Sequence, residues 1–295
     1  IAQLAMGTGM LRAERDILLY GRYSRPVYMA LANFTDPFIP GVSGSPTGSL
    51  QLLRELGIPI REGDRLRRPV DLSVEEKSRL ASEMIVRAGM SAPPELVPYV
   101  AGLIVGETFS LPQEPDGSGL KDAAEFATSL NAVAKQDQPI LGLEVVKGDR
   151  RGYYEQMRKL LLRYRRKIAE AIGLVEDLSI ETGPRRYLQL LDATSYVNEK
   201  MIGTITSMVL SLGIADPYRP LMGIVRRGGI AKISARCSRL LAIRNVNLAK
   251  AVREAGKLVG GEGGGHATAA GARVEEDRVQ DFIRAFEEEI LRQVA

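Results

Sequence analysis

Residues 260–272 read Gly-Gly-Glu-Gly-Gly-Gly-His-Ala-Thr-Ala-Ala-Gly-Ala, and His266 within this run is the only histidine of the chain. Glycine adopts positive φ readily and lets backbone N–H groups come close to a ligand. The small residues after His266 are typical of a tightly packed helix start, where free N–H groups can hold an anion. The run therefore predicts a phosphate-binding loop made by Gly263, Gly264, Gly265 and His266. A flexible linker would be richer in serine and other polar residues.

The length and composition describe an ordinary globular protein. The chain has 295 residues, 45% of them hydrophobic and 26% charged, which allows one large or two medium domains. No apolar stretch reaches the roughly 18 residues that a membrane span needs, and neither end has a secretory signal pattern. The single cysteine, Cys237, excludes an internal disulfide and fits a reducing compartment. We expect a cytoplasmic protein without a membrane partner. Because the sequence starts with Ile1 rather than Met, a further portion of the protein upstream of it is possible.

Charge is distributed unevenly along the chain. The formal net charge is +4, but residues 217–257 contain ten Lys and Arg against one acid, Glu254. After Val274 the balance reverses, with seven acids against three arginines. Basic density beside the glycine run indicates a polyanionic partner, most plausibly nucleic acid. A merely solvated basic face remains the alternative.

The apolar periodicity predicts helices in the first part of the chain and alternating strands and helices in the last part. Helices are expected at about 48–56, 73–88, 95–105, 120–133, 151–176, 198–212, 247–254 and 276–294. Strands are expected at 187–192, 221–226, 230–236 and 272–274. This pattern predicts an α/β fold, in which a helical connector region precedes an α/β domain with a small mixed sheet flanked by helices.

The most linker-like stretch, residues 112–119, sets the expected domain boundary. Residues 1–117 are then a helix-rich connector and possible partner-docking region. Residues 118–295 form the domain that carries the glycine run, and this domain is the one expected to bind nucleic acid.

The expected strand at 230–236 carries Lys232, Ser234 and Arg236 at alternate positions, so all three point from one face. A hydroxyl between two cations suits a phosphate oxygen, which arginine can bind with two hydrogen bonds. The alternative is an edge strand that charges protect from aggregation. Cys237 follows on the opposite face and is expected to be a small buried hydrophobe.

Three stretches in a fixed order resemble the substrate-binding domain associated with the DHH phosphoesterases. They are Ile-Ser-Ala-Arg at 233–236, Val-Asn-Leu-Ala-Lys-Ala at 246–251, and Gly-Gly-Gly-His-Ala-Thr-Ala-Ala-Gly at 263–271. Further matches make most of the chain similar to the part of archaeal RecJ-like proteins that follows their nuclease domain. These matches lie at 19–22, 24–26, 35–41, 130–132, 142–143 and 148–149. The resemblance implies single-stranded DNA or RNA as ligand, and association with the GINS complex and the replicative helicase.

Two departures from the family pattern bear on catalysis. The nuclease domain of the family binds manganese or magnesium through residues that include an Asp-His-His run, which a chain with one histidine cannot contain. We therefore expect no metal site, no catalytic residue and no cofactor in this chain, and manganese or magnesium only with an upstream DHH domain. Where relatives have Asn-Ala-Cys-Gly-Arg, residues 131–135 read Asn-Ala-Val-Ala-Lys, so the Gly-Arg pair is missing.

Three functions remain open on these grounds. The first is a non-catalytic, single-strand-binding RecJ-like protein of archaeal DNA replication or repair. The second is the C-terminal part of an active metal-dependent 5′–3′ single-strand exonuclease, and the third is a docking piece of the helicase with a vestigial glycine loop. The expected nucleic-acid contacts are Lys232, Ser234, Arg236, Arg239, Gly263, Gly264, Gly265 and His266. The imidazole of His266 would strengthen a phosphate contact when protonated.

Overall fold

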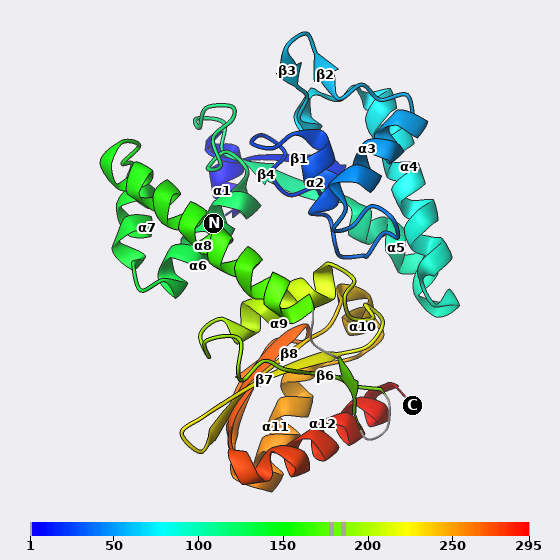
Figure 1. Ribbon diagram of the computed structural model, residues 1–295. Helices are drawn as coiled ribbons and strands as arrows, with labels where there is room; N and C mark the ends of the chain where they lie inside the picture. The colour runs from blue at the N-terminus through cyan, green and yellow to red at the C-terminus, as the bar shows by residue number, and fades with distance from the viewer. Residues whose placement is uncertain (1, 177–179, 184–186, 295) are drawn as a thin grey trace. The chain divides into compact units, whose positions relative to one another are not determined.

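The computed structural model describes residues 2–176, 180–183 and 187–294, which form two compact units (Figure 1). The first unit comprises Ile1–Thr35, Ile39–Ser91 and Val100–Arg166. The second comprises Asp36–Phe38, Ala92–Tyr99 and Lys167–Ala295. Among the helices described, none is both long and apolar enough to cross a membrane.

The first unit is mainly helical. Its helices are α1 (Ala2–Gly7), α2 (Val27–Ala32), α3 (Pro46–Glu55), η1 (Pro69–Asp71), α4 (Val74–Ser91), α6 (Ala123–Lys135), α7 (Pro139–Val146) and the larger part of α8 (Gly152–Glu176), and α5 (Val97–Ile104) ends in it. Its strands are β1 (Arg12–Ile17), which pairs antiparallel with β4 (Val105–Ser110), and the short pair β2 (Arg61–Glu62) and β3 (Arg65–Leu66).

Helix starts in this unit follow local sequence signals. Ser73 and Glu76 form a capping box at the start of α4, where a helix is expected from residue 73: the Ser73 N–H donates to Glu76 Oε2 (2.8 Å) and the Glu76 N–H to Ser73 Oγ (3.2 Å). Strands β1 and β4 were not predicted. β1 reads Arg-Ala-Glu-Arg-Asp-Ile and has no regular apolar alternation, so pairing with β4 rather than its own pattern makes it a strand.

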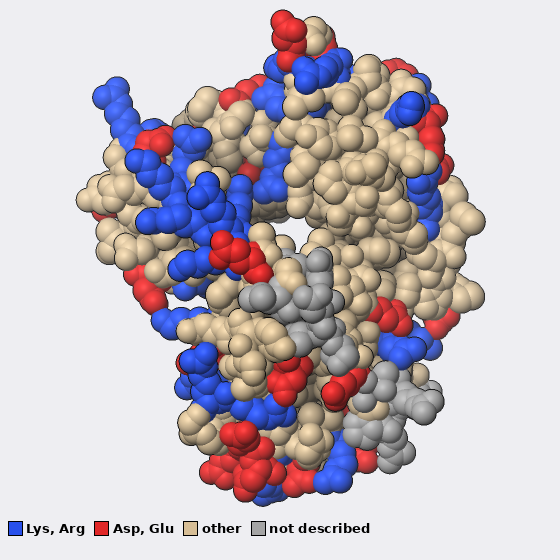
Figure 2. Space-filling view, viewed as in Figure 1, with Lys and Arg blue, Asp and Glu red and all other residues tan. Residues whose placement is uncertain are grey.

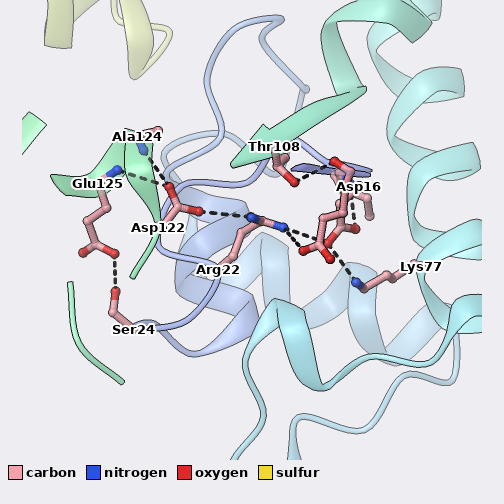
Figure 3. Close-up of polar contacts among 10 residues, drawn as sticks. Asp16, Arg22, Ser24, Lys77, Thr108, Asp122, Ala124 and Glu125 are labelled. Atoms are coloured by element: carbon pink, nitrogen blue, oxygen red, sulfur yellow. Dashed lines mark hydrogen bonds and ion pairs between the residues drawn. The ribbon is translucent and has the colours of Figure 1, made fainter. Parts of the chain in front are cut away.

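A buried polar cluster lies at the centre of the first unit (Figure 3). The fully buried guanidinium of Arg22 donates to Asp122 Oδ2 (3.0 Å), Glu14 Oε1 (2.9 Å) and Asp16 Oδ2 (3.1 Å), and Lys77 Nζ donates to Asp16 Oδ2 (2.8 Å). Burial alone would lower the pKa of Arg22, but the carboxylates of Glu14 and Asp122 raise it above its ordinary value. Because β1, β4, α4 and the start of α6 meet here, this Arg22 cluster ties the elements of the unit together.

The second unit is built on a six-stranded mixed sheet of order β5-β6-β7-β8-β10-β9. Its strands are β5 (Glu181–Thr182), β6 (Gln189–Asp192), β7 (Leu221–Arg227), β8 (Ile230–Arg236), β9 (Glu262–Gly265) and β10 (Ala269–Glu275). Among the described strands of this sheet, β6 and β7 are the one pair that runs in parallel. The expected α/β fold with a small mixed sheet flanked by helices is confirmed.

Helices cover both faces of this sheet (Figure 1). The helices that lie wholly within this unit are η2 (Pro94–Leu96), α9 (Ile202–Ser211), α10 (Arg239–Ile243), α11 (Leu248–Val259), η3 (Glu276–Arg278) and α12 (Val279–Val294). α11 and α12 cover one face, where Ile233, Ala272, Val252 and Phe282 belong to one hydrophobic core. α9 contacts β7 and β8, and it lies on the opposite face because Thr206 packs against Gly223 there. The side chains of β8 that do not enter the core therefore point toward α9.

The strands expected at 221–226 and 230–236 are confirmed as β7 and β8, which form a hairpin with Gly228 (φ +59°) and Gly229 (φ +78°) as its two-residue turn. The helix start expected after His266 is wrong. Residues 262–275 form the hairpin of β9 and β10 instead, and Ala269 and Ala270 are strand residues. Small residues fit here because β9 packs closely against α11, and larger side chains would not fit between the strand and the helix.

Candidate nucleic-acid interface

A row of small residues crosses four strands of the second unit on the face away from α11 and α12. The strand register places Gly223 of β7 opposite Ser234 of β8, Ser234 opposite Gly271 of β10, and Gly271 opposite Gly264 of β9. Residues directly opposite each other in antiparallel strands share a face. These four residues, called here the glycine row, form a strip with a single hydroxyl and no bulky side chain.

Ser234 and Arg236 lie at the end of this row that α9 borders. Ser234 is buried, and a Cβ at Gly203 of α9 would lie 2.7 Å from Arg236 Nη2 and 3.2 Å from Ser234 Oγ. Gly203 therefore leaves the space in which the guanidinium and the hydroxyl lie together. Gly203 is the second residue of α9, so the positive dipole end of this helix lies in the same neighbourhood.

The guanidinium of Arg236 contacts only neutral oxygens. Nε donates to Ser207 Oγ (2.8 Å), and Nη1 donates to the carbonyls of Ala235 (2.8 Å) and Ala270 (3.4 Å). Among the described residues, no carboxylate lies within ion-pair distance of it. Burial lowers the pKa of Arg236 below its ordinary value, since no acid offsets the loss of solvent. A partly buried cation without a counter-charge favours an anionic ligand.

A second, charged row runs beside the glycine row. Lys232 lies opposite Arg273 of β10, and Arg273 lies opposite Glu262 of β9. Arg273 is exposed and lies 3.3 Å from Glu199, while Lys232 has no ion pair with any described residue. Lys232, Ser234 and Arg236 therefore share one face, as their alternation predicts. Arg273 and Ser207 were missed, since only the strand register and the placement of α9 bring them here.

The three consecutive glycines of β9 meet different surroundings. A Cβ at Gly263 would lie 2.5 Å from Val252 Cγ1 of α11, so Gly263 faces the core. A Cβ at Gly264 would have nothing within 4 Å, so Gly264 faces the open side of the sheet. Gly265 has φ +147°, which disfavours any side chain. Of these three glycines, Gly264 is the one that lies on the glycine row.

His266 lies in the exposed turn between β9 and β10. Its backbone N–H donates to the Ala269 carbonyl (2.8 Å), so this amide serves the turn. The Ala267 and Thr268 carbonyls accept from Leu248 (3.0 Å) and Cys237 (3.1 Å) and fix the turn against α11 and β8. Arg236 lies opposite Ala269, so the turn is at the Arg236 end of the sheet.

Arg239 is engaged elsewhere. Its backbone N–H and Nε donate to Asp36 Oδ2 (3.0 and 3.2 Å), and burial raises the pKa of Asp36 against the opposing effect of this arginine. Six of the ten cations in residues 217–257 are paired with acids: Arg219, Arg226, Arg239, Arg244, Lys250 and Lys257. The basic density of this segment is therefore largely compensated by acids.

Cys237 is buried, as expected from its alternation with Arg236. Burial, together with the charge of Asp36, raises the pKa of its thiol to about 12, so the thiol stays protonated at neutral pH. In the described part of the chain, no three His, Cys, Asp or Glu side chains are grouped closely enough to hold a metal ion.

Comparison with known domain families gives two matches. Residues 19–95 match the DHH-CID domain, and residues 189–292 match the DHHA1 domain. The second match contains the whole of the glycine row and Arg236. Both matches support the resemblance to the DHH phosphoesterases that the motifs indicate.

A curated relative is an uncharacterized protein of Methanocaldococcus jannaschii, 27% identical over 273 residues, which are 92% of this chain and 54% of that protein. The chain thus spans about half the length of the relative. Similar solved structures are CDC45 of Entamoeba histolytica (10% identity, 96% of this chain and 58% of that one, TM-score 0.49) and RecJ of Thermus thermophilus with Mg²⁺ (16%, 85% and 38%, 0.43). Each TM-score is below 0.5, so neither likeness supports a conclusion about this chain.

Proposed function

We propose that this chain, which carries a DHH-CID domain and a DHHA1 domain, binds single-stranded nucleic acid on the sheet face of its second unit without being catalytic itself. The observation that carries the proposal is the partly buried guanidinium of Arg236, which has neutral hydrogen-bond partners and, among the described residues, no carboxylate. A backbone phosphate would supply the missing negative charge. The hydroxyl of Ser234 and the end of α9 lie close enough to share it.

The shape of the surface fits a strand rather than a compact ligand. At Gly271 and Gly264 the glycine row carries no side chain, and beside it lies Lys232, which has no ion pair with any described residue and whose charge can neutralise a further phosphate. The protein has 5% aromatic residues and no tryptophan, so base stacking contributes little. We infer contacts mainly to phosphate, with weak sequence preference and strong salt dependence. His266 and Gly264 border the strip, whereas Arg239 contributes little because it is paired with Asp36.

The biological setting is part of the same proposal. The motif resemblance supports an archaeal RecJ-like protein that acts in DNA replication or repair with the GINS complex and the replicative helicase. Residues 1–117, which include the DHH-CID match, are the proposed docking region. Co-purification of GINS with the full chain, and its loss when residues 19–95 are replaced by those of a distant relative, tests this part separately.

The binding test compares two variants that lose the same charge. Fluorescence anisotropy with a labelled single-stranded DNA of about 20 nucleotides measures Kd for the wild type, Arg236→Ala and Arg253→Ala. Arg253 is exposed on α11, which covers the opposite face of the sheet. We expect Arg236→Ala to weaken binding about tenfold or more, since a charge-assisted contact contributes about 1.5–3 kcal/mol. Arg253→Ala stays within about twofold. Equal affinity of Arg236→Ala and the wild type rejects the proposed site.

A second candidate is the C-terminal part of a metal-dependent 5′–3′ single-strand exonuclease. It is favoured by the length of the Methanocaldococcus jannaschii relative, of which this chain spans about half. In that case the sheet face would hold a strand for an upstream DHH domain with manganese or magnesium. Manganese-dependent release of nucleotides by the full-length gene product supports this candidate. Binding without release supports the non-catalytic one.

A further inference from the structure

A second uncompensated group of arginines lines a cavity in the first unit. The cavity has a volume of about 220 Å³ and lies between the segment after β1, α6 and α8. Its polar wall contains Ser24, Arg25, Glu125, Ser129 and Arg165. All lining residues belong to the first unit, so this cavity is separate from the glycine row. Figure 2 shows Lys and Arg side chains gathered over α8, the helix that carries Arg165.

Two of the lining arginines form no ion pair with a described residue, although the charge of Glu125 acts on both. In the described ranges, neither Arg25 nor Arg165 forms an ion pair, and Arg25 lies over the ring of Tyr20 at 4.7 Å. Burial lowers the pKa of Arg25 and the nearby charge of Arg165 lowers it further, and the opposing effects of Tyr20 and Glu125 do not fully offset them. The third arginine of the wall, Arg158, differs because it is paired with Glu155 at 2.9 Å.

One carboxyl group lines the cavity and cannot balance this charge. The Ser24 hydroxyl donates to Glu125 Oε2 (2.6 Å), as Figure 3 shows, and the charges that act on Glu125 include those of Arg25, Asp122 and Arg165. Burial raises the pKa of Glu125, so its negative charge is poorly stabilised. The wall therefore has more positive than negative charge.

The rest of the wall is apolar, with Leu120, Met157 and Leu161 beside the ring of Tyr154. A cavity of this size is smaller than the roughly 300–1,000 Å³ that drug-sized ligands occupy. It suits one phosphate group attached to a small body, because arginine binds phosphate with two parallel hydrogen bonds and the apolar wall can cover a ring.

We propose that this cavity binds a small phosphomonoester, with its phosphate between Arg25 and Arg165 and its apolar body against Leu120 and Met157. Free inorganic phosphate shares the same chemistry at the arginines. The apolar wall distinguishes the two sources, since only the ester gains from covering it.

Isothermal titration calorimetry on the full chain with phenyl phosphate, inorganic phosphate and phenol tests the proposal. We expect saturable binding of phenyl phosphate, weaker binding of inorganic phosphate and none of phenol. Equal affinity for the two phosphates assigns the site to inorganic phosphate and still supports the arginine clamp. Absence of saturable phosphate binding overturns the proposal.

Variants show whether phenyl phosphate binds in this cavity or on the sheet face of the second unit. Arg165 is exposed, so Arg165→Gln should fold, and it should weaken the binding of phenyl phosphate about tenfold or more. Arg25→Gln should weaken it to a similar extent if this variant folds. Arg163→Gln, exposed on the same helix and outside the cavity wall, is the matched control, and Arg236→Gln controls for the other site. Unchanged affinity of Arg165→Gln overturns the proposal, and so does a loss of affinity in Arg236→Gln alone, which assigns the phosphate to the sheet face.

Discussion

Arg22 and Arg236 are two guanidinium groups withdrawn from solvent in the same chain, and their surroundings differ in one respect. Arg22 is hydrogen-bonded to three carboxylates, and two of them, Glu14 and Asp122, raise its pKa despite burial. Arg236 is hydrogen-bonded to a hydroxyl and two carbonyls, and burial lowers its pKa. Both guanidinium groups donate several hydrogen bonds, but only Arg22 has its charge neutralised by described residues of the protein.

This difference separates a structural role from a binding role. An arginine surrounded by carboxylates holds elements together and gains nothing from an external anion. An arginine held only by neutral oxygens keeps a net charge that an incoming phosphate can neutralise. The same criterion divides the described part of the basic segment at 217–257. Six of its cations are paired, and of the four that are not, Arg227 and Arg253 are exposed, whereas Lys232 and Arg236 are partly buried on the sheet.

The largest expected effect on stability comes from replacing Arg22, the guanidinium whose charge is balanced by carboxylates. Arg22→Met should lower the free energy of unfolding by about 3–5 kcal/mol, because the carboxylates of Asp16 and Asp122 stay buried without their partner. Urea unfolding followed by circular dichroism measures the loss. Arg12→Met is the control: its side chain is 71% exposed and lies 3.8 Å from Glu14, so the change should be at most about 0.5 kcal/mol. An Arg22→Met protein as stable as the Arg12→Met protein would remove the structural role.

The pH dependence of stability tests a second arginine whose charge is balanced by a carboxylate. Arg67 holds Glu76 through a hydrogen bond and lowers the pKa of that carboxyl from 4.5 to about 2. The pKa is lower in the folded state, so the pair stabilises the protein fully above pH 4.5, and this contribution is lost as the pH falls toward 2.

The shift of the pKa from 4.5 to about 2 limits the contribution of Glu76 to about 3 kcal/mol. The difference in unfolding midpoint between the wild type and Glu76→Gln should therefore be present at neutral pH and disappear at about pH 2. A difference that is the same at both pH values contradicts the assignment of this stability to the charged pair.

Substitutions of two neighbouring glycines of β9 test the proposed binding face around Arg236 with smaller expected effects. Gly263→Ala places a Cβ 2.5 Å from Val252 and should cost about 1–3 kcal/mol of stability. Gly264→Ala has open space, so its stability should stay within about 0.5 kcal/mol, while single-strand affinity falls about three- to tenfold. Thermal unfolding and anisotropy on both variants measure this. Full affinity in Gly264→Ala would place the strand away from the glycine row.

Local patterns in the sequence predicted the sheet face well. The alternation of Lys232, Ser234 and Arg236, with a two-glycine turn before it, fixes a hairpin and its side-chain directions without help from the rest of the chain. The Ser73 capping box and the Asn247 cap of α11 are equally local, and both are present.

Features that depend on distant partners were not predictable in this way. The pairing of Arg239 with Asp36 spans 203 residues, and no local pattern marks it. The glycine run has no apolar alternation, so the strand character of β9 comes from packing against α11 and pairing with β10. The placement of Gly203 and Ser207 beside Arg236 follows from the packing of α9, and an isolated glycine near the start of an apolar helix is the one signal that marks such a close approach.

The salt dependence of single-strand binding tests most directly whether Arg236 holds a phosphate. Plotting log K against log salt concentration for the wild type gives a negative slope, and each neutralised phosphate contributes about 0.7 to it. The account predicts that Arg236→Ala reduces the slope by about 0.7–1, while Arg253→Ala leaves it unchanged. A slope for Arg236→Ala equal to that of the wild type would contradict the claim that its uncompensated charge is the one that holds the strand.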